Sequence, residues 1–215
     1  MESVNTILPL SYLPSIDHYC YIAQNEHLLF EIHETYPKQT CRNRTTIYSA
    51  NGTLRLTVPV VKVHGNNTRT HEVLLDNKSP WNKVHLRAIS SAYNNSPFFL
   101  YYKDAFADIY QHHESRLIDF NIQLIKLINN FLKINPHISM TTDYVRDYDS
   151  ITDKRICPKD PSCFDHYLNK YNQVFSDRLP FIPNLSILDL LFNEGPYAGN
   201  YLKSAKLKEQ MVDYQ

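Results

Sequence analysis

The chain has 215 residues, of which 43% are hydrophobic and 20% are charged. These values are ordinary for a soluble globular protein, and the length favours a single domain spanning residues 1–215. The 22 basic and 22 acidic residues cancel, which excludes a nucleic-acid binder whose whole surface is basic. Residues 31–70 nevertheless hold six Lys or Arg against two Glu, so positive charge is concentrated in one segment.

No stretch approaches the ~18 consecutive apolar residues that cross a bilayer. The N-terminal residues M-E-S-V-N-T lack the basic and apolar regions of a signal peptide. We therefore expect a cytoplasmic protein without a membrane span, in which the four cysteines are thiols. Cys157 and Cys163 flank five residues, a spacing that differs from the usual metal-binding knuckle. We predict neither a metal site nor a cofactor.

The chain opens with a strand–helix–strand pattern. The short apolar segments Thr6–Leu10 and Leu28–Ile32 predict two buried strands, and the intervening residues 15–25 place apolar side chains on one helical face. A strand, a helix and a strand in this order predict a parallel pair of strands.

A dense polar run, His33–Arg44 (H-E-T-Y-P-K-Q-T-C-R-N-R), follows the second strand. The strand-forming segments Thr45–Ser49 and Thr53–Val61 come next, and Asn51-Gly52 between them is a strong signal for a β-hairpin. Open α/β sheets place their ligand sites just past the ends of buried strands. The polar run therefore marks a predicted binding site.

Helices are predicted for the central part of the chain. Ser79-Pro80 and Ser96-Pro97 are each typical of an N-cap followed by proline in the first helical position. A third helix, Arg116–Ile134, carries a strong apolar stripe.

After these helices the pattern predicts a strand at His137–Thr141 and a long surface loop over residues 145–180. Ser186 then precedes a last apolar helix that reaches Asn193. The predicted fold is a single α/β domain with a mostly parallel central sheet, an added β-hairpin and flanking helices.

The residue types in the polar run indicate recognition of an anionic sugar-like molecule. Lys38, Arg42 and Arg44 can hold a phosphate or carboxylate through charge-assisted hydrogen bonds of ~1.5–3 kcal/mol each. Gln39 and Asn43 offer paired donors and acceptors that suit sugar hydroxyls.

A general base is also available in the run. His33 can accept a proton near neutral pH, and Glu34 can orient it or act itself. We therefore predict His33 and Glu34 as the catalytic pair. A solvated basic loop at the foot of a hairpin is the alternative that involves no ligand.

Other chemistries find little support. Pro37 stands where a zinc-protease H-E-x-x-H helix needs its second histidine, and the glycine-rich phosphate loops and the G-x-S-x-G elbow are absent from the sequence. Cys41, beside Arg42, is either an activated nucleophile or a plain thiol, and the plain thiol is favoured because no base stands at a fixed spacing.

Five segments occur here in one order: L-P-L-S-Y-L-P, the polar run extended to T-T-I, L-T-V-P-V, S-P-F-F-L-Y-Y and F-I-P-N-L-S-I-L-D-L-L-F-N-E-G-P. Together they resemble the WbqC-like family over nearly the whole chain, and the form H-E-x-Y-x-K-Q-T-x-R-N-R resembles its Bacteroidetes-type branch. Tyr12, Tyr36 and Asn193 lie in these segments and complete the predicted substrate-binding set.

The resemblance implies a role in surface-polysaccharide or O-antigen synthesis. The implied reaction is transfer of a group, such as an acyl group, to a nucleotide-linked or phosphorylated sugar. Leu8 stands where the family usually has glutamine, and Ile32-His33 stand near its usual acidic pair, so carboxylate chemistry is not carried over to this chain.

Two rivals belong to other functional classes. A non-catalytic sugar-phosphate sensor or assembly factor needs the cations but no base. A purely structural partner protein needs neither, and it predicts a basic run that is fully exposed and lines no concave site.

Overall fold

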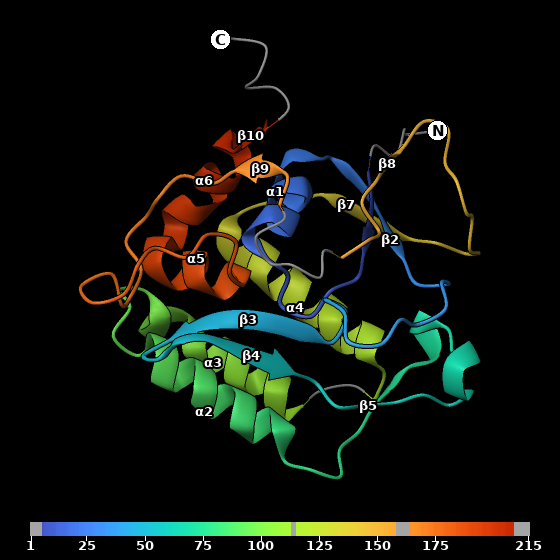
Figure 1. Cartoon of the computed structure of the whole chain (residues 1–215), viewed down its shortest axis with the longest axis horizontal. Coiled ribbons are helices and arrows are strands. Elements are labelled where there is room, and N and C mark those ends of the chain that lie inside the picture. Colours follow the sequence, from blue (N-terminus) through green and yellow to red (C-terminus); the bar gives the residue numbers. More distant parts are fainter. Residues whose placement is uncertain (1–5, 113–114, 158–163, 209–215) are drawn as a thin grey trace.

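The structure is a computed structural model that describes residues 6–112, 115–157 and 164–208 (Figure 1). The strands are β1 (Thr6–Pro9), β2 (His27–Glu31), β3 (Arg44–Ser49), β4 (Gly52–Thr57), β5 (Val60–Val61), β6 (Leu74–Leu75), β7 (His137–Met140), β8 (Thr152–Asp153), β9 (His166–Tyr167) and β10 (Lys206–Leu207). The helices are α1 (Ile16–Gln24), α2 (Trp81–Tyr93), α3 (Phe99–Gln111), α4 (Leu117–Leu132), α5 (Ile187–Glu194) and α6 (Ala198–Ser204), with 3-10 turns at Gly65–Asn67, Thr70–Glu72 and Gly195–Tyr197.

The central sheet has four strands in the order β7-β2-β1-β8, and every neighbouring pair is parallel. Strands β1 and β2 are joined through α1, so the predicted strand–helix–strand unit is confirmed. Because all four strands run the same way, their carboxyl ends meet at one edge, beside the start of α1. This is the edge where open α/β sheets bind ligands.

Helix α1 begins where its sequence provides a cap. The hydroxyl of Ser15 accepts the backbone N–H of His18 at 3.4 Å, and the side-chain oxygen of Asn184 accepts that of Asp17 at 2.9 Å. Both acceptors satisfy donors that a helix leaves free in its first turn. The start of α1 is therefore tied to a segment more than 160 residues away.

The hairpin of β3 and β4 is confirmed, with Thr46 opposite Arg55 and Ser49 opposite Gly52. The two-residue turn is Ala50-Asn51, one position earlier than predicted, and Gly52 takes the positive φ of 101° as the first residue of β4. The predicted second strand is shorter because it ends at Thr57. Val60 and Val61 instead form β5, which pairs with β6.

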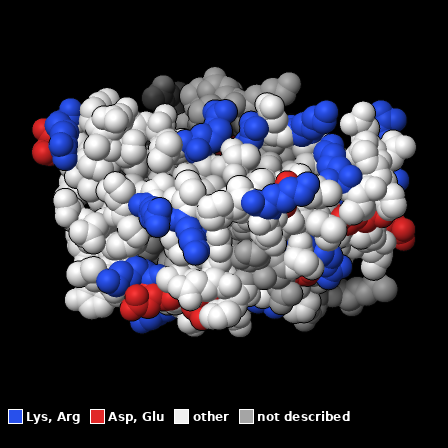
Figure 2. All heavy atoms as spheres, turned by 90° about the horizontal axis from the view of Figure 1, so that it is seen from below, with Lys and Arg blue, Asp and Glu red and all other residues white. Residues whose placement is uncertain are grey.

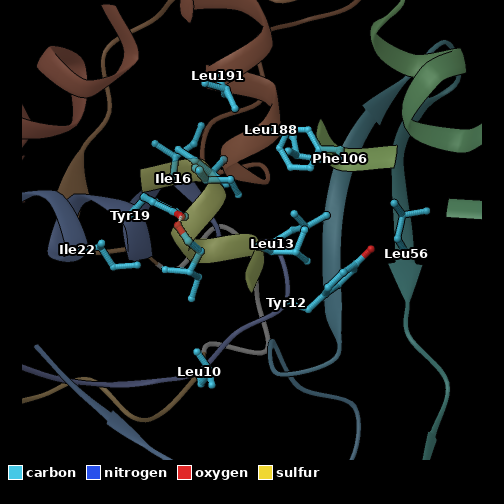
Figure 3. Packing of buried hydrophobic residues seen from close by; sticks show 14 of the residues in the cluster. Leu10, Tyr12, Leu13, Ile16, Tyr19, Ile22, Leu56, Phe106, Leu188 and Leu191 are labelled. Carbon is cyan, nitrogen blue, oxygen red and sulfur yellow. Dashed lines mark hydrogen bonds between the residues drawn. The ribbon is translucent and has the colours of Figure 1, made fainter. Parts of the chain in front are cut away.

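The core lies between the central sheet, the hairpin and the helices. Figure 3 shows the side chains of the segment after β1, of α1 and of α5 packed together, with Leu56 of β4 beside them. The labelled aliphatic side chains and Tyr12 and Tyr19 are at most 4% exposed. The apolar stripe of α4 is buried as predicted, and the helix ends at Leu132, after which Lys133 takes a left-handed conformation.

Two predicted helix caps were wrong. Neither Ser79 nor Ser96 caps a helix, because α2 begins at Trp81 after Pro80 and α3 begins at Phe99 after Phe98. The hydroxyl of Ser96 instead donates to the carbonyl of Tyr93 at 2.7 Å, at the end of α2.

The predicted long loop over residues 145–180 also contains ordered pairing. Strand β8 within it adds the fourth strand to the central sheet, with Thr152 beside Thr6. Residues 158–163 of this segment lie outside the described residues.

Candidate functional site

A cavity of about 730 Å³ lies beyond the carboxyl end of β1. Its walls come from the turn after β1, the first turn of α1, residues 38–41, the β3–β4 hairpin, the segment after β8 and residues 184–186. The volume falls in the ~300–1,000 Å³ range of small-molecule sites. Four parts of the chain, distant in sequence, therefore enclose one concave site.

Strained backbone is concentrated in these walls. In the described part of the chain, four residues other than glycine have a positive φ, and three of them line the cavity. They are Leu13 at 41°, Gln39 at 59° and Asn184 at 56°. Each such conformation costs ~1–3 kcal/mol and is typical of functional sites. The fourth, Lys133, has an ordinary explanation as the residue that ends α4.

The hairpin presents two arginines to the cavity from one face. Thr46 lies directly opposite Arg55, and Arg44 precedes Thr46 by two residues, so all three side chains share that face. Arg44 and Arg55 are diagonal neighbours, a relation in which side chains start about 7–8 Å apart and like charges repel. An anion between them would relieve this repulsion.

Three cations of the cavity wall have no partner among the residues that the structure describes. Among the described residues, the side chains of Lys38, Arg44 and Arg55 make neither a hydrogen bond nor an ion pair, and Nε of Arg44 is enclosed and unsatisfied. A fourth cation, Lys154, is paired with Asp165 at 3.0 Å. The unpaired charge is therefore on the wall formed by the hairpin and residues 38–41.

The two carboxylates of the cavity wall are already occupied. Asp17 accepts the ring Nδ1–H of His166 at 2.9 Å and two backbone N–H groups at 2.8 and 3.0 Å. Asp165 accepts the hydroxyl of Tyr21 at 2.8 Å and pairs with Lys154, and these partners hold the pKa of Asp165 below its usual value despite its partial burial. Neither acid is free to neutralise Arg44 or Arg55.

His18 contributes an imidazole side chain to the cavity wall. Burial, with a smaller contribution from the charge of Arg42, lowers the pKa of His18 to about 4, although nearby Asp17 opposes the shift. The ring is therefore neutral at pH 7. Its Nε2 is enclosed and has no hydrogen-bond partner, which costs ~1–3 kcal/mol. A ligand hydroxyl that reached this nitrogen would recover that cost.

The predicted site residues divide into two groups. Lys38, Gln39 and Arg44 line the cavity, whereas Arg42 turns away from it and is 2% exposed. Its guanidinium binds Glu34 Oε1 at 2.5 Å and the carbonyl of Arg155 at 3.2 Å. Arg42 thus holds together the segments that follow β2 and β8.

The predicted catalytic pair, His33 and Glu34, does not line the cavity. Glu34 is engaged by Arg42 and by the hydroxyl of Thr70, and burial raises the pKa of Glu34 above its usual value despite the opposing charge of Arg42. The ring of His33 packs against that of His71 with centroids 4.4 Å apart. The catalytic roles of His33 and Glu34 stay predictions.

The other four predicted substrate-binding residues are buried and also lie outside the cavity wall: Tyr12, Tyr36, Asn43 and Asn193. The hydroxyl of Tyr12 contacts Nδ1 of His85 at 2.8 Å and the hydroxyl of Tyr110. Asn43 and Asn193 donate to the backbone carbonyls of Val58 and Asp189 at 2.8 and 2.7 Å. These contacts fix the fold around the site.

Tyr36 is the exception among these four, because its buried hydroxyl has no partner. Burial raises the pKa of Tyr36 well above its usual value, against the effects of Arg42 and Arg44. Lys62 lies over its ring at 5.3 Å and donates to its backbone carbonyl at 3.2 Å.

The expectation of four thiols was wrong for two of the cysteines. Cys41 and Cys157 form a disulfide with their Cα atoms 5.9 Å apart, whereas Cys20 is a free, buried thiol. No local pattern indicates this pairing, because the two residues are 116 positions apart. Both cysteines line the cavity.

The predictions that the chain has no metal site and no membrane span can be compared with the structure over residues 6–112, 115–157 and 164–208. Within these ranges no three His, Cys, Asp or Glu side chains are grouped so as to hold a metal ion. Their helices also include none with the length and apolar character that a membrane span requires.

Cations elsewhere on the surface differ from those of the cavity. Figure 2 shows one face, seen from the lower side of Figure 1, where Lys and Arg side chains are spread in separate groups and some have carboxylates beside them. Positive charge at the surface is therefore common in this molecule. Enclosure and the lack of a partner distinguish Arg44.

Comparison with known proteins agrees with this description. The profile of the WbqC-like protein family matches residues 11–170. The chain belongs to this family. The range matched by the WbqC-like family contains most of the cavity wall, from Ser11 to Asp165. Asn184 and Ser186 lie beyond the end of this range.

The WbqC-like chain is also similar to a protein of Mycobacterium tuberculosis named "Uncharacterized protein Rv1507c". The two are 26% identical over 226 residues, which cover 92% of this chain and 96% of the relative. No solved structure matches the WbqC-like chain significantly.

Sequence reasoning missed several polar residues of the cavity, among them His18, Arg55 and Asn184. The position of Arg55 could have been predicted from the hairpin, because a two-residue turn at Ala50-Asn51 places Arg55 opposite Thr46. His18 and Asn184 had ordinary explanations as helix-face and capping residues. Nothing in the local sequence shows that both line one cavity.

Proposed function

We propose that this WbqC-like protein binds a nucleotide-linked or phosphorylated sugar in the cavity at the carboxyl end of β1. The observation that carries the proposal is the set of unpaired cations, Lys38, Arg44 and Arg55, on the wall of an enclosed site. Arg44 is half-buried and its Nε is enclosed and unsatisfied, and leaving such a charge without a counter-ion is costly. A phosphate or diphosphate group would supply that counter-ion and would also be attracted by the exposed Lys38 and Arg55. Gln39 and Thr40 on the same wall offer hydrogen bonds to sugar hydroxyls.

The sugar part of the proposal rests on the sequence resemblance, which implies modification of sugars for surface polysaccharides in the cytoplasm. In the leading form, the protein is an enzyme that transfers a group, such as an acyl group, to the bound sugar. The base would then be His18, at the cavity wall, or His33 and Glu34 after a rearrangement that brings them to the ligand. The proposal involves no nucleic acid.

A non-catalytic sugar-phosphate-binding or assembly protein is the second candidate. Its support is the position of Glu34, which is held by Arg42 and Thr70 outside the cavity. The low pKa of His18, about 4, also makes this ring a weak base at neutral pH. In this form the cations bind the ligand and no bond is made or broken.

A thermal-shift screen against nucleotide-linked sugars, sugar phosphates and acyl-carrier thioesters tests the binding proposal. A ligand at 100 times its dissociation constant adds ~2.7 kcal/mol of stability. The shift should be lost in the Arg44→Ala/Arg55→Ala double variant and kept in Lys83→Ala, which removes an exposed cation outside the cavity. The proposal fails if no anionic ligand stabilises the protein, or if the double variant responds as the wild type does.

Mass spectrometry of a binding sugar, incubated with the protein and an acyl-carrier thioester, separates the two candidates. A mass increase that depends on His18 or His33 supports the enzyme. An unchanged sugar that still binds supports the non-catalytic protein.

A further inference from the structure

The disulfide between Cys41 and Cys157 is built into the cavity wall. Cys41 belongs to the segment that carries Lys38 and Gln39, and it lies three residues before Arg44. Cys157 ends the described segment that follows β8 and carries Lys154. The bridge therefore joins the wall with unpaired cations to the opposite wall.

Both sulfur atoms have polar neighbours of a kind that stabilises a thiolate. Nη1 of Arg42 lies 3.4 Å from Sγ of Cys157, and the hydroxyl of Ser11 donates to Sγ of Cys41 at 3.0 Å. A cation lowers a thiol pKa more than a neutral hydroxyl does, because charge-assisted hydrogen bonds are about twice as strong. Glu34 shares Arg42 and moderates its effect.

Cys20 provides an internal contrast. It is fully buried, and burial, with a smaller effect of Asp17, raises the pKa of its thiol far above the usual value. No cation is among the groups that act on it. A thiol in such surroundings is inert, whereas Cys41 and Cys157 are both only half-buried.

We propose that the Cys41–Cys157 bridge is a redox-active modification site that couples the thiol state of the protein to anion binding in the cavity. The inference rests on the proposed function for the ligand and for the reducing compartment, the cytoplasm. In a reducing compartment disulfides are rare and are usually catalytic or regulatory. A bridge at the wall of a binding site, with a cation beside one sulfur, fits that class.

The co-reactant is a low-molecular-weight thiol. Its thiolate attacks Sγ of Cys41, the bond between the two cysteines breaks, and Cys157 leaves as a thiolate beside Arg42. Cys41 then carries the small thiol as a mixed disulfide. A second thiol attacks that mixed disulfide and releases Cys41, so that two thiols become one small-molecule disulfide and the protein gains two thiols.

Reduction alters the cavity because the bridge holds residues 38–41 in place. Gln39 in this segment has a positive φ, a conformation that surrounding structure must maintain. Without the bridge, the ligand must order the segment as it binds, and ordering weakens affinity. We expect the reduced protein to bind anions about tenfold more weakly.

Isothermal titration calorimetry with inorganic pyrophosphate tests the coupling on the full chain. Oxidised wild type should bind about tenfold more tightly than protein reduced with dithiothreitol and freed of reductant without air. Cys157→Ser should match the reduced protein in both states. Cys163→Ser, whose position lies outside the described residues, is the matched control and should keep the redox response.

The thiol chemistry has a separate readout. Peptide mapping of the acid-quenched reaction with 2-mercaptoethanol should find the Cys41–Cys157 cross-link before reaction and the adduct on Cys41 afterwards. Equal pyrophosphate affinity in the two thiol states overturns the coupling, and an adduct confined to Cys157 overturns the assigned direction of attack. If oxidised protein binds no pyrophosphate while the mapping succeeds, the proposed function has failed and the thiol site stands.

Discussion

Arg42 and Arg44 stand two positions apart and have opposite surroundings. Arg42 is 2% exposed and is held by Glu34, a backbone carbonyl and the sulfur of Cys157. Arg44 begins β3, faces the cavity and has no partner among the described residues. One arginine holds parts of the fold together, and the other lines the cavity without a partner among the described residues.

The difference lies in what the surrounding chain supplies. Glu34 is the acid of the polar run. It pairs with Arg42 because the segments after β2 and β8 converge at these two side chains. The charged side chain that shares this face of the hairpin with Arg44 is another arginine, Arg55, and not an acid. A cation of a cavity wall therefore indicates a candidate binding site when no neighbouring acid pairs with it.

Arg42→Ala should give the largest effect. Removing one partner of a buried ion pair leaves Glu34 buried and unpaired, which costs ~3–5 kcal/mol. Urea denaturation should show this loss, and Arg42→Ala combined with Glu34→Gln should recover part of it. A loss below ~1 kcal/mol would mean that the pair behaves as an exposed one.

Arg44→Ala should have the reverse profile. The free energy of unfolding should change by less than ~0.5 kcal/mol, or rise because repulsion from Arg55 is removed. Affinity for the anionic ligand should fall by ~10–100-fold, the equivalent of one charge-assisted hydrogen bond of ~1.5–3 kcal/mol. Calorimetric titration and urea denaturation of one preparation measure both. A strongly destabilised but fully binding variant would reverse the comparison.

Asp189 extends the comparison to a buried acid whose partners are neutral. It accepts the hydroxyl of Tyr171 at 2.5 Å and the amide of Gln173 at 2.8 Å, and burial outweighs these bonds and raises the pKa of Asp189 to about 6. The folded state therefore binds this proton more tightly than the unfolded state does. Its contribution to stability is full below pH 4 and is lost as the pH rises through 6.

Asp189→Asn removes this titration. The stability of the variant minus that of wild type should rise between pH 4 and pH 7 by on the order of 1–3 kcal/mol. Urea denaturation at both pH values gives the difference. A constant difference across this range would show that Asp189 keeps an ordinary pKa.

His33→Ala should have the smallest effect on binding. The ring lies outside the cavity and contacts His71, so ligand affinity should change less than twofold, or ~0.4 kcal/mol. The same titration measures it, with His71→Ala as the matched control for the ring contact. A tenfold loss in His33→Ala alone would bring the predicted base into the site.

The sequence was most informative where structure depends on near neighbours. The strand–helix–strand pattern around α1, the β3–β4 hairpin and the apolar stripe of α4 all depend on residues close in sequence. All three were predicted, although the hairpin turn lies one position earlier than expected. Helix starts at Trp81 and Phe99 were misplaced because a serine–proline pair also suits the end of the preceding segment, as the bond from Ser96 to Tyr93 shows.

For the candidate site, sequence reasoning located the polar run. It did not show which side chains of the run face the cavity. It singled out Lys38, Gln39 and Arg44, which line the cavity, yet it could not tell which cation would meet Glu34. The backbone N–H of Asp17, beside His18, meets Asn184 across more than 160 residues, and Cys41 meets Cys157 across 116. Contacts of this kind follow from the assembled topology and leave no local pattern.

The pairing of β1 with β8 has a consequence for how the protein is made. Thr6 lies beside Thr152, and the N–H of Ile16 reaches the carbonyl of Leu185 at 2.9 Å. At ~5–20 residues per second, the ribosome delivers the last cavity wall roughly 10–35 s after the first. Until then Arg44 and Arg55 face solvent on an unfinished surface. A chain that stops before Asn184 therefore lacks the wall formed by Asn184 and Ser186.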